Sequence, residues 1–207
     1  MNNVDYTLYL VTDRDVLRGR DLIKCIEDSI LGGVTLVQLR EKNVTSREFY
    51  EIAIKVKEVT SKYNVPLIIN DRLDIALAID ADGLHIGQKD LPASVARKIL
   101  GKDKILGVSA ATLQEALKAE KDGADYLGVG AVFSTSTKKD ARDVSYETLS
   151  NITTSVNIPV VAIGGINENN VTKLKGSNID GIAVVSCILG KENVKVAAEK
   201  MLDRFKE

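Results

Sequence analysis

The sequence has few of the residues that build metal clusters, disulfide scaffolds or hydrolytic sites. Its 207 residues include two cysteines, one histidine, three prolines and no tryptophan. Cys25 and Cys187 lie far apart without a CxxC motif, which is typical of a protein of the reducing cytoplasm rather than of an oxidised scaffold. A lone histidine without a GxSxG motif argues against a hydrolytic triad. His85 lies inside an expected strand, and we interpret it as an interior residue with satisfied hydrogen bonds.

Neither the net charge nor the length of the apolar runs indicates that the protein binds nucleic acid or spans a membrane. The 28 basic and 29 acidic side chains leave a formal net charge of −1, so no global field attracts nucleic acid or an anionic surface. The longest apolar runs, such as 158–163, fall far short of a membrane span, and the first residues lack a basic signal segment. We expect a soluble, unprocessed protein that binds small molecules rather than nucleic acid or membranes, and we leave a homo-oligomer open.

Short β-branched runs alternate with amphipathic segments along the chain. The expected strands begin at Thr7, Thr35, Pro66, Gly83, Ile105, Tyr126, Pro159 and Gly181. Helical spacing marks residues 21–31, 46–62, 113–121 and 194–205, and Thr45 with Glu48 predicts a capping box. Because the runs are apolar at most positions, they are typical of parallel strands covered on both faces.

Eight such alternations predict an α/β fold, a single-domain (β/α)8 TIM barrel over residues 1–207. An open doubly wound sheet is the alternative. It is disfavoured because no glycine-rich nucleotide turn follows the first strand. The GVG at 128–130 lacks the third glycine of a dinucleotide motif and lies too far along the chain.

Polar residues follow seven of the expected strands, at the end where this fold places its site. They are Gln38, Arg40, Lys42, Asn70, Asp71, Gln88, Asp90, Ser109, the segment after Val129, Gly164, Gly165 and Ser186. Residues two apart on an extended segment share a face, so Gln38, Arg40 and Lys42 converge while Glu41 points elsewhere. Two cations and an amide suit an anionic group, although a solvated strand end fits this stretch equally well.

Asp71 and Asp90 follow consecutive strands, where two carboxylates can hold Mg²⁺ together with phosphate oxygens and water. Structural roles are the alternative: Asp71 as the cap of the next helix, and Asp90 as a residue just before a helix-start proline. The nearby Arg40 and Lys42 favour the metal interpretation and indicate a polyphosphate substrate.

Gly164 and Gly165 allow a phosphate to approach the backbone after the seventh strand, and Ser186 adds a hydroxyl after the eighth. A tight turn that needs positive φ is the alternative for the two glycines.

With seven motifs in order, the chain resembles the thiamine-phosphate synthase family. The motifs are QLREK at 38–42, IIND at 68–71, HIGQKD at 85–90, GVSA at 107–110, FSTSTKKDA at 133–141, AIGGI at 162–166 and VVSCI at 184–188. The resemblance implies a TIM-barrel transferase that joins 4-amino-2-methyl-5-hydroxymethylpyrimidine diphosphate to 4-methyl-5-(2-phosphoethyl)thiazole, with or without a carboxyl group on the thiazole. The products are thiamine phosphate and diphosphate.

The resemblance also implies roles for individual residues. The pyrimidine diphosphate would be bound by Gln38, Leu39, Arg40, Glu41, Lys42, Asn70, Ser109 and Lys138, of which Arg40, Lys42, Ser109 and Lys138 would be catalytic. The thiazole phosphate would be bound by Thr135, Ser136, Thr137, Gly165, Val185 and Ser186. One Mg²⁺ per subunit would be held by Asp71 and Asp90. Two alternatives stay open, a barrel of the thiazole tautomerase type and a non-catalytic protein that binds thiamine precursors.

Overall fold

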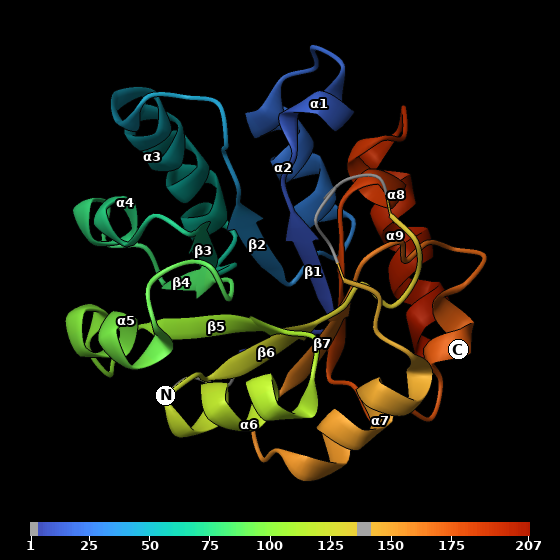
Figure 1. The fold of residues 1–207 in the computed structure, drawn as a ribbon. Coiled ribbons are helices and arrows are strands. Elements are labelled where there is room, and N and C mark those ends of the chain that lie inside the picture. The colour runs from blue at the N-terminus through green and yellow to red at the C-terminus, as the bar shows by residue number, and fades with distance from the viewer. Residues whose placement is uncertain (1–3, 136–141) are drawn as a thin grey trace.

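Eight parallel strands close into a barrel in sequence order (Figure 1). They are β1 (Leu8–Val11), β2 (Leu36–Leu39), β3 (Leu67–Asn70), β4 (Gly83–Ile86), β5 (Ile105–Ala110), β6 (Tyr126–Val129), β7 (Val160–Ile163) and β8 (Gly181–Val184). This computed structural model describes residues 4–135 and 142–207. Because β1 pairs with both β2 and β8, the barrel is closed, which confirms the (β/α)8 prediction and excludes an open sheet.

Helices surround the barrel as an outer ring (Figure 1). They are α1 (Arg14–Leu17), α2 (Leu22–Leu31), α3 (Ser46–Lys62), α4 (Leu73–Ala78), α5 (Ala93–Leu100), α6 (Leu113–Lys121), α7 (Tyr146–Ser155), α8 (Ser186–Leu189) and α9 (Val194–Lys206), with the 3₁₀ helix η1 (Val171–Leu174) between β7 and β8. The predicted capping box of α3 is confirmed. Helix α2 begins one residue later than predicted because Asp21 is its N-cap and accepts a hydrogen bond from Lys24 N at 2.8 Å.

The strands bury side chains on two sides, as their apolar runs predict. Leu8 and Leu10 of β1 face the helices, whereas Tyr9 points into the barrel together with Tyr126 of β6. Space for this pair depends on Gly107 of β5, where an added Cβ would lie 2.2 Å from Tyr126 Cζ. The barrel interior is therefore a packed layer on which a site can be built.

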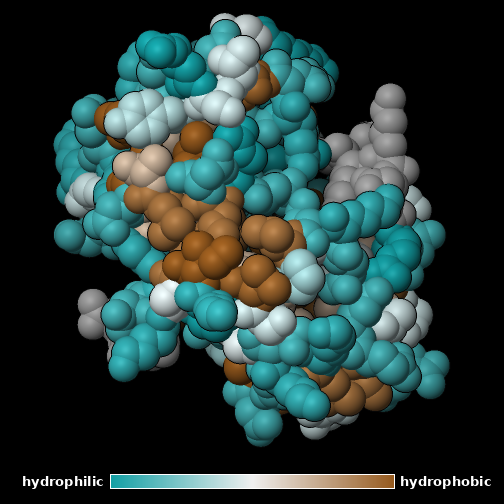
Figure 2. Space-filling model, turned by 60° about the vertical axis from the view of Figure 1, so that its left-hand side comes forward, coloured by the Kyte–Doolittle hydropathy of each residue, from teal (hydrophilic) through white to brown (hydrophobic). Residues whose placement is uncertain are grey.

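An apolar patch lies on the face formed by α4 and α5, which Figure 2 brings forward. Leu77 of α4 and Leu91, Val95 and Ile99 in and before α5 are between 41% and 52% exposed there. Within the described ranges, no helix is both long and apolar enough to cross a membrane.

Candidate active site

A cavity of about 710 Å³ opens at the carboxyl ends of the strands. Eleven of the sixteen residues whose roles the family resemblance implies line it: Gln38, Arg40, Lys42, Asn70, Asp71, Asp90, Ser109, Thr135, Gly165, Val185 and Ser186. Gln88 and Gly164, also expected at the strand ends, line it too. They come from, or directly follow, six of the eight strands or the loop after β6. The barrel thus brings together residues that are up to about 150 positions apart in the sequence.

Five predicted residues are not placed in the cavity lining. The Leu39 side chain is fully buried in the core, and Glu41 turns away to form an ion pair with Arg14, with Nε and Oε1 2.8 Å apart. Only their backbone groups are left to meet a substrate. Ser136, Thr137 and Lys138 lie outside the described residues.

Cations line the wall of the cavity that follows β2. Gln38 is buried, and Arg40 and Lys42 follow it at two-residue spacing, as predicted. Arg40 Nη1 lies 3.3 Å from Asp13 Oδ2, and the Arg40 backbone N–H donates to Thr12 Oγ1 at 2.9 Å. Lys42 forms an ion pair with Asp71 of the next strand end. Each cation therefore has a carboxylate that orients it toward the cavity.

Asp71 and Asp90 belong to the cavity and not to helix caps. The N-cap position of α4 is Arg72 and that of α5 is Pro92, and neither helix has a side-chain cap, so the structural interpretation of Asp71 is wrong. Asp71 has a φ of 61°, in the left-handed region that aspartate tolerates better than most residues. Asp90 Oδ2 accepts a hydrogen bond from Gly87 N at 2.7 Å, which fixes its turn.

The two carboxylates are close enough to affect one another. The pKa of Asp90 is raised, first by burial and then by the charge and hydrogen bonding of Asp71. Crowded carboxylates of this kind fit a hard divalent cation, which would relieve their repulsion. Within residues 4–135 and 142–207 no group of three or more His, Cys, Asp and Glu could hold a metal. A carboxylate pair still matches Mg²⁺, which takes one or two carboxylates and completes its shell with phosphate and water.

Backbone forms the opposite wall of the cavity, after β7. Gly164 and Gly165 have φ values of 101° and 64°, so the tight positive-φ turn that was the alternative for these glycines is present. An added Cβ on Gly165 would lie 2.4 Å from Ser134 O, so the loop after β6 packs directly on this turn. The Gly165 carbonyl accepts hydrogen bonds from Asn167 Nδ2 at 3.1 Å and Asn170 Nδ2 at 2.9 Å. These hydrogen bonds brace the turn, which lines the cavity together with Thr135 and Ser186.

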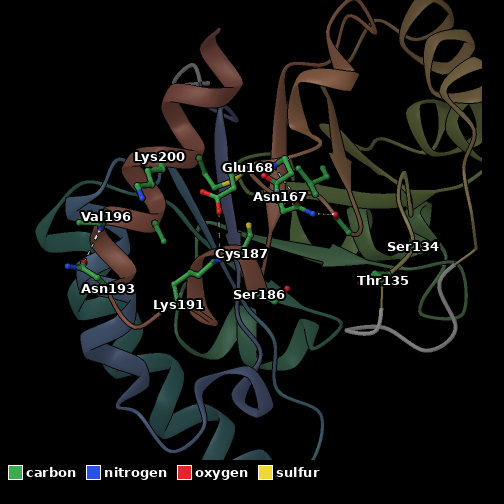
Figure 3. A pocket seen from close by; sticks show the side chains of 15 residues that line it. Ser134, Thr135, Asn167, Glu168, Ser186, Cys187, Lys191, Asn193, Val196 and Lys200 are labelled. Carbon is green, nitrogen blue, oxygen red and sulfur yellow. Dashed lines mark hydrogen bonds and ion pairs between the residues drawn. The ribbon is translucent and has the colours of Figure 1, made fainter.

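A side pocket of about 570 Å³ adjoins this wall (Figure 3). Thr135, Gly165 and Ser186 line both spaces. The side pocket also contains Lys191, whose Nζ lies 3.8 Å from Glu168 Oε1, and Cys187. Burial raises the pKa of the Cys187 thiol to about 12, so it is protonated near neutral pH and a poor nucleophile.

Tyr9, Asp13 and Arg142 are among the cavity residues that the sequence did not predict. Tyr9 and Asp13 belong to β1 and the turn after it, and Arg142 follows the loop after β6. Arg142 Nη2 forms an ion pair with Glu115 Oε2 at 2.7 Å, and its carbonyl accepts from Ala131 N at 2.7 Å. The cluster of charges around Arg142 in KDARD was the available signal for that residue. His85 is a satisfied interior residue, as interpreted, since its ring bonds to Tyr126 and Ser109.

Comparison with known proteins agrees with this geometry. The family model described as thiamine monophosphate synthase matches residues 8–188. The chain belongs to this family. Thiamine-phosphate synthase of Clostridium tetani is 69% identical over 99% of this chain and 98% of its own length. That of Alkaliphilus oremlandii is 61% identical over 97% and 96%.

A solved structure extends the likeness to three dimensions. Thiamine phosphate pyrophosphorylase from Pyrococcus furiosus is 42% identical and superposes with a TM-score of 0.90, covering 98% of this chain and 96% of its own. The resemblance inferred from seven motifs is therefore confirmed for the family and for the fold.

Proposed function

We propose that this chain, a transferase of the thiamine monophosphate synthase family, joins the aminopyrimidine diphosphate to the thiazole phosphate in the cavity at the carboxyl end of its barrel. Residues 1–207 would act as one catalytic unit. The observation that carries the proposal is that a single cavity has cations and a carboxylate pair after β2 to β4, and a tight backbone turn with hydroxyls after β6 to β8. In a closed eight-stranded barrel these walls face one another, so two anionic substrates can meet between them.

The wall after β2 to β5 is assigned to the pyrimidine diphosphate. Gln38, Asn70 and Ser109 supply amide and hydroxyl groups for the ring and its substituents. Arg40 and Lys42 supply positive charge to the diphosphate, with Arg40 suited to a bidentate grip. The family motif adds Lys138, and it assigns to Leu39 and Glu41 contacts that only their backbone groups could make here.

Asp71 and Asp90 are assigned to one Mg²⁺ per subunit. When bound there, the cation supplies charge stabilisation to the departing diphosphate. Lys42, which contacts Asp71, would then be shared between the carboxylate and the diphosphate.

The wall after β6 to β8 is assigned to the thiazole phosphate. Hydroxyls and backbone groups are offered there by Thr135, Gly165, Val185 and Ser186. Hydrogen bonds from Asn167 and Asn170 to the Gly165 carbonyl brace the turn. The family motif adds Ser136 and Thr137. Phosphate sites after strands seven and eight are common in this fold, which supports the assignment.

The proposed reaction needs charge stabilisation and alignment rather than proton transfer. The bond between the pyrimidine CH₂ carbon and oxygen breaks, and its electron pair leaves with diphosphate. The electron-rich aminopyrimidine stabilises the resulting cation, and the lone pair of the thiazole nitrogen forms the new carbon–nitrogen bond. No proton moves in these steps, which is consistent with a sequence that contains a single histidine. Arg40, Lys42 and Lys138 would lower the barrier by meeting the charge that develops on the leaving group.

For the setting we propose the cytoplasm, with small-molecule substrates as the partners. The homo-oligomer stays a prediction.

One assay tests the proposal. Purified protein is mixed with both substrates and Mg²⁺, and diphosphate and thiamine phosphate are measured together. We expect the two products in equal amounts, and none when Mg²⁺ is chelated. A tautomerase would convert the thiazole phosphate without releasing diphosphate. A binding protein would hold substrate stoichiometrically and form no product, and either result would overturn the proposal.

A further inference from the structure

A continuous chain of four hydrogen bonds crosses the barrel interior from β2 to β5. Gln38 Nε2 donates to Tyr9 Oη at 2.7 Å, and Tyr9 Oη lies 2.7 Å from Tyr126 Oη. Tyr126 Oη lies 2.9 Å from His85 Nδ1, and His85 Nε2 lies 2.9 Å from Ser109 Oγ. The chain therefore connects two residues assigned to the pyrimidine through three that the reaction does not use.

The middle of the chain is shielded from water. Tyr9 is 1% exposed and Tyr126 is fully buried. Burial raises the pKa of both hydroxyls far above neutrality, so each keeps its hydrogen. Each of these two buried hydroxyls faces two partners within the hydrogen-bond chain. Leaving its one hydrogen without an acceptor would be costly, so each hydroxyl donates to one partner and accepts from the other. The hydrogen bonds must therefore all run in one direction.

Gln38 sets that direction. Its amide nitrogen faces Tyr9 and can only donate, so the Tyr9 hydroxyl accepts and passes its own hydrogen to Tyr126. Tyr126 then donates to His85 Nδ1, which must be the unprotonated nitrogen of the ring. His85 carries its hydrogen on Nε2 and donates it to Ser109 Oγ. Three groups at its ends are not used within the hydrogen-bond chain: the Gln38 carbonyl oxygen as an acceptor, and the second Gln38 amide hydrogen and the Ser109 hydroxyl as donors.

We propose that Tyr9, Tyr126 and His85 are positioning residues that fix the hydrogen-bond pattern presented to the pyrimidine. This inference rests on the proposed function for the identity of the ligand. An aminopyrimidine offers an exocyclic amino donor and ring-nitrogen acceptors, which complement a carbonyl acceptor and a hydroxyl donor. A 4-oxo analogue carries an acceptor where the amino group stood, so it would leave buried polar groups unpaired. The hydrogen-bond chain thus selects aminopyrimidines over oxopyrimidines.

The direction of the hydrogen-bond chain can be determined from the tautomer of the His85 ring. Because the protein contains a single histidine, ¹⁵N NMR of labelled, ligand-free protein reports His85 alone. We expect the hydrogen on Nε2, seen as a one-bond coupling there, and an unprotonated Nδ1. A hydrogen on Nδ1 would mean the reverse direction and would overturn the proposal. The measurement needs no substrate, so it remains decisive even where the proposed function fails.

Variants test whether the His85 tautomer controls the specificity for the aminopyrimidine. Tyr126→Phe removes the donor to His85 Nδ1 while keeping the ring. We expect a mixture of tautomers and a roughly 10- to 100-fold lower kcat/KM for the aminopyrimidine diphosphate, with weaker rejection of the 4-oxo analogue and an unchanged KM for the thiazole phosphate. Tyr9→Phe breaks the chain one bond earlier and is expected to act alike, which gives a second route where one variant fails to fold.

Tyr6→Phe is the matched control. Tyr6 is 8% exposed, and its ring packs on that of Tyr126 with 4.9 Å between centroids, so it shares the same interior layer. Its hydroxyl is outside the chain of four bonds and within the electrostatic influence of Asp125 and Asp180. We expect the wild-type tautomer and specificity. Equal effects of Tyr6→Phe and Tyr126→Phe, or a Tyr126→Phe protein with unchanged tautomer and specificity, would refute the positioning role. Failure of the proposed function would instead abolish turnover in every protein, including wild type.

Discussion

Lys42 and Asp71 form an ion pair between the ends of β2 and β3, which joins the cationic wall of the cavity to its carboxylate pair. The same Asp71 raises the pKa of Asp90. One carboxylate therefore both holds a cation assigned to the diphosphate and completes the pair assigned to Mg²⁺.

Replacing Asp71 by asparagine tests this double role. Asp71→Asn keeps the size of the side chain and removes its charge, so we expect kcat to fall about 100- to 1000-fold and the Mg²⁺ concentration for half-maximal rate to rise. The measurement is an initial-rate titration with Mg²⁺. Asp74→Asn is the control, because Asp74 is an exposed residue of α4 paired with Arg72 outside the cavity. Survival of both the rate and the metal dependence in Asp71→Asn would disprove the metal assignment.

Asp13 orients Arg40 from the turn after β1, and this gives a second prediction. Asp13→Asn removes the charge 3.3 Å from Arg40 Nη1, while asparagine can still cap α1 in its place. We expect kcat/KM for the pyrimidine diphosphate to fall about 10-fold because the guanidinium is less well held. Arg14→Gln, which breaks the neighbouring ion pair with Glu41, should change it less than about 2-fold. A similar loss in both variants would show that Asp13 acts only through the fold.

The fold was predictable because each strand corresponds to a short apolar run in the sequence. The runs beginning at Thr7 and Gly181 became neighbouring strands that close the barrel, and helix α3 matched its predicted bounds. Sequence periodicity did not reveal that η1 stands where an α-helix would complete the repeat. There, Asn167 and Asn170 bond to the Gly165 carbonyl, so side-chain hydrogen bonds shape this connection.

The site was predictable where a residue directly follows a strand. Arg40, Lys42, Asp71 and Asp90 entered the cavity lining for this reason. Arg142 was not assigned because it reaches the cavity only after the chain has returned to pair with Ala131. Such contacts depend on the closed barrel and leave no local periodicity in the sequence.

Gly165 offers a test of the phosphate wall, the wall after β6 to β8 that is assigned to the thiazole phosphate. An alanine there would combine a φ of 64° with a Cβ 2.4 Å from Ser134 O. We expect Gly165→Ala to lower the melting temperature and to raise the KM for the thiazole phosphate at least 10-fold, because the loop after β6 must move. Gly19→Ala is the matched control, since Gly19 has a φ of 84° with nothing within 4 Å of an added Cβ. Gly19→Ala should lower the free energy of unfolding by about 1 kcal/mol, because alanine is strained at positive φ, and should leave the KM for the thiazole phosphate unchanged. Equal KM values in the two variants would argue against the assigned phosphate wall.

Arg97 of α5 stabilises the opposite end of the barrel and should affect stability without affecting substrate binding. Its guanidinium donates to Gly123 O at 2.9 Å, Gly101 O at 2.6 Å and Lys104 O at 2.7 Å, and it pairs with Asp125. Arg97→Lys keeps the charge but cannot satisfy all four acceptors, so we expect a loss of about 2–4 kcal/mol of unfolding free energy and a clearly lower melting temperature. Both KM values should stay at wild type because Arg97 is absent from the cavity lining. Arg204→Lys alters an exposed ion pair with Glu207 and should change stability by less than about 1 kcal/mol. Equal melting temperatures for the two variants would contradict the role given to the Arg97 network.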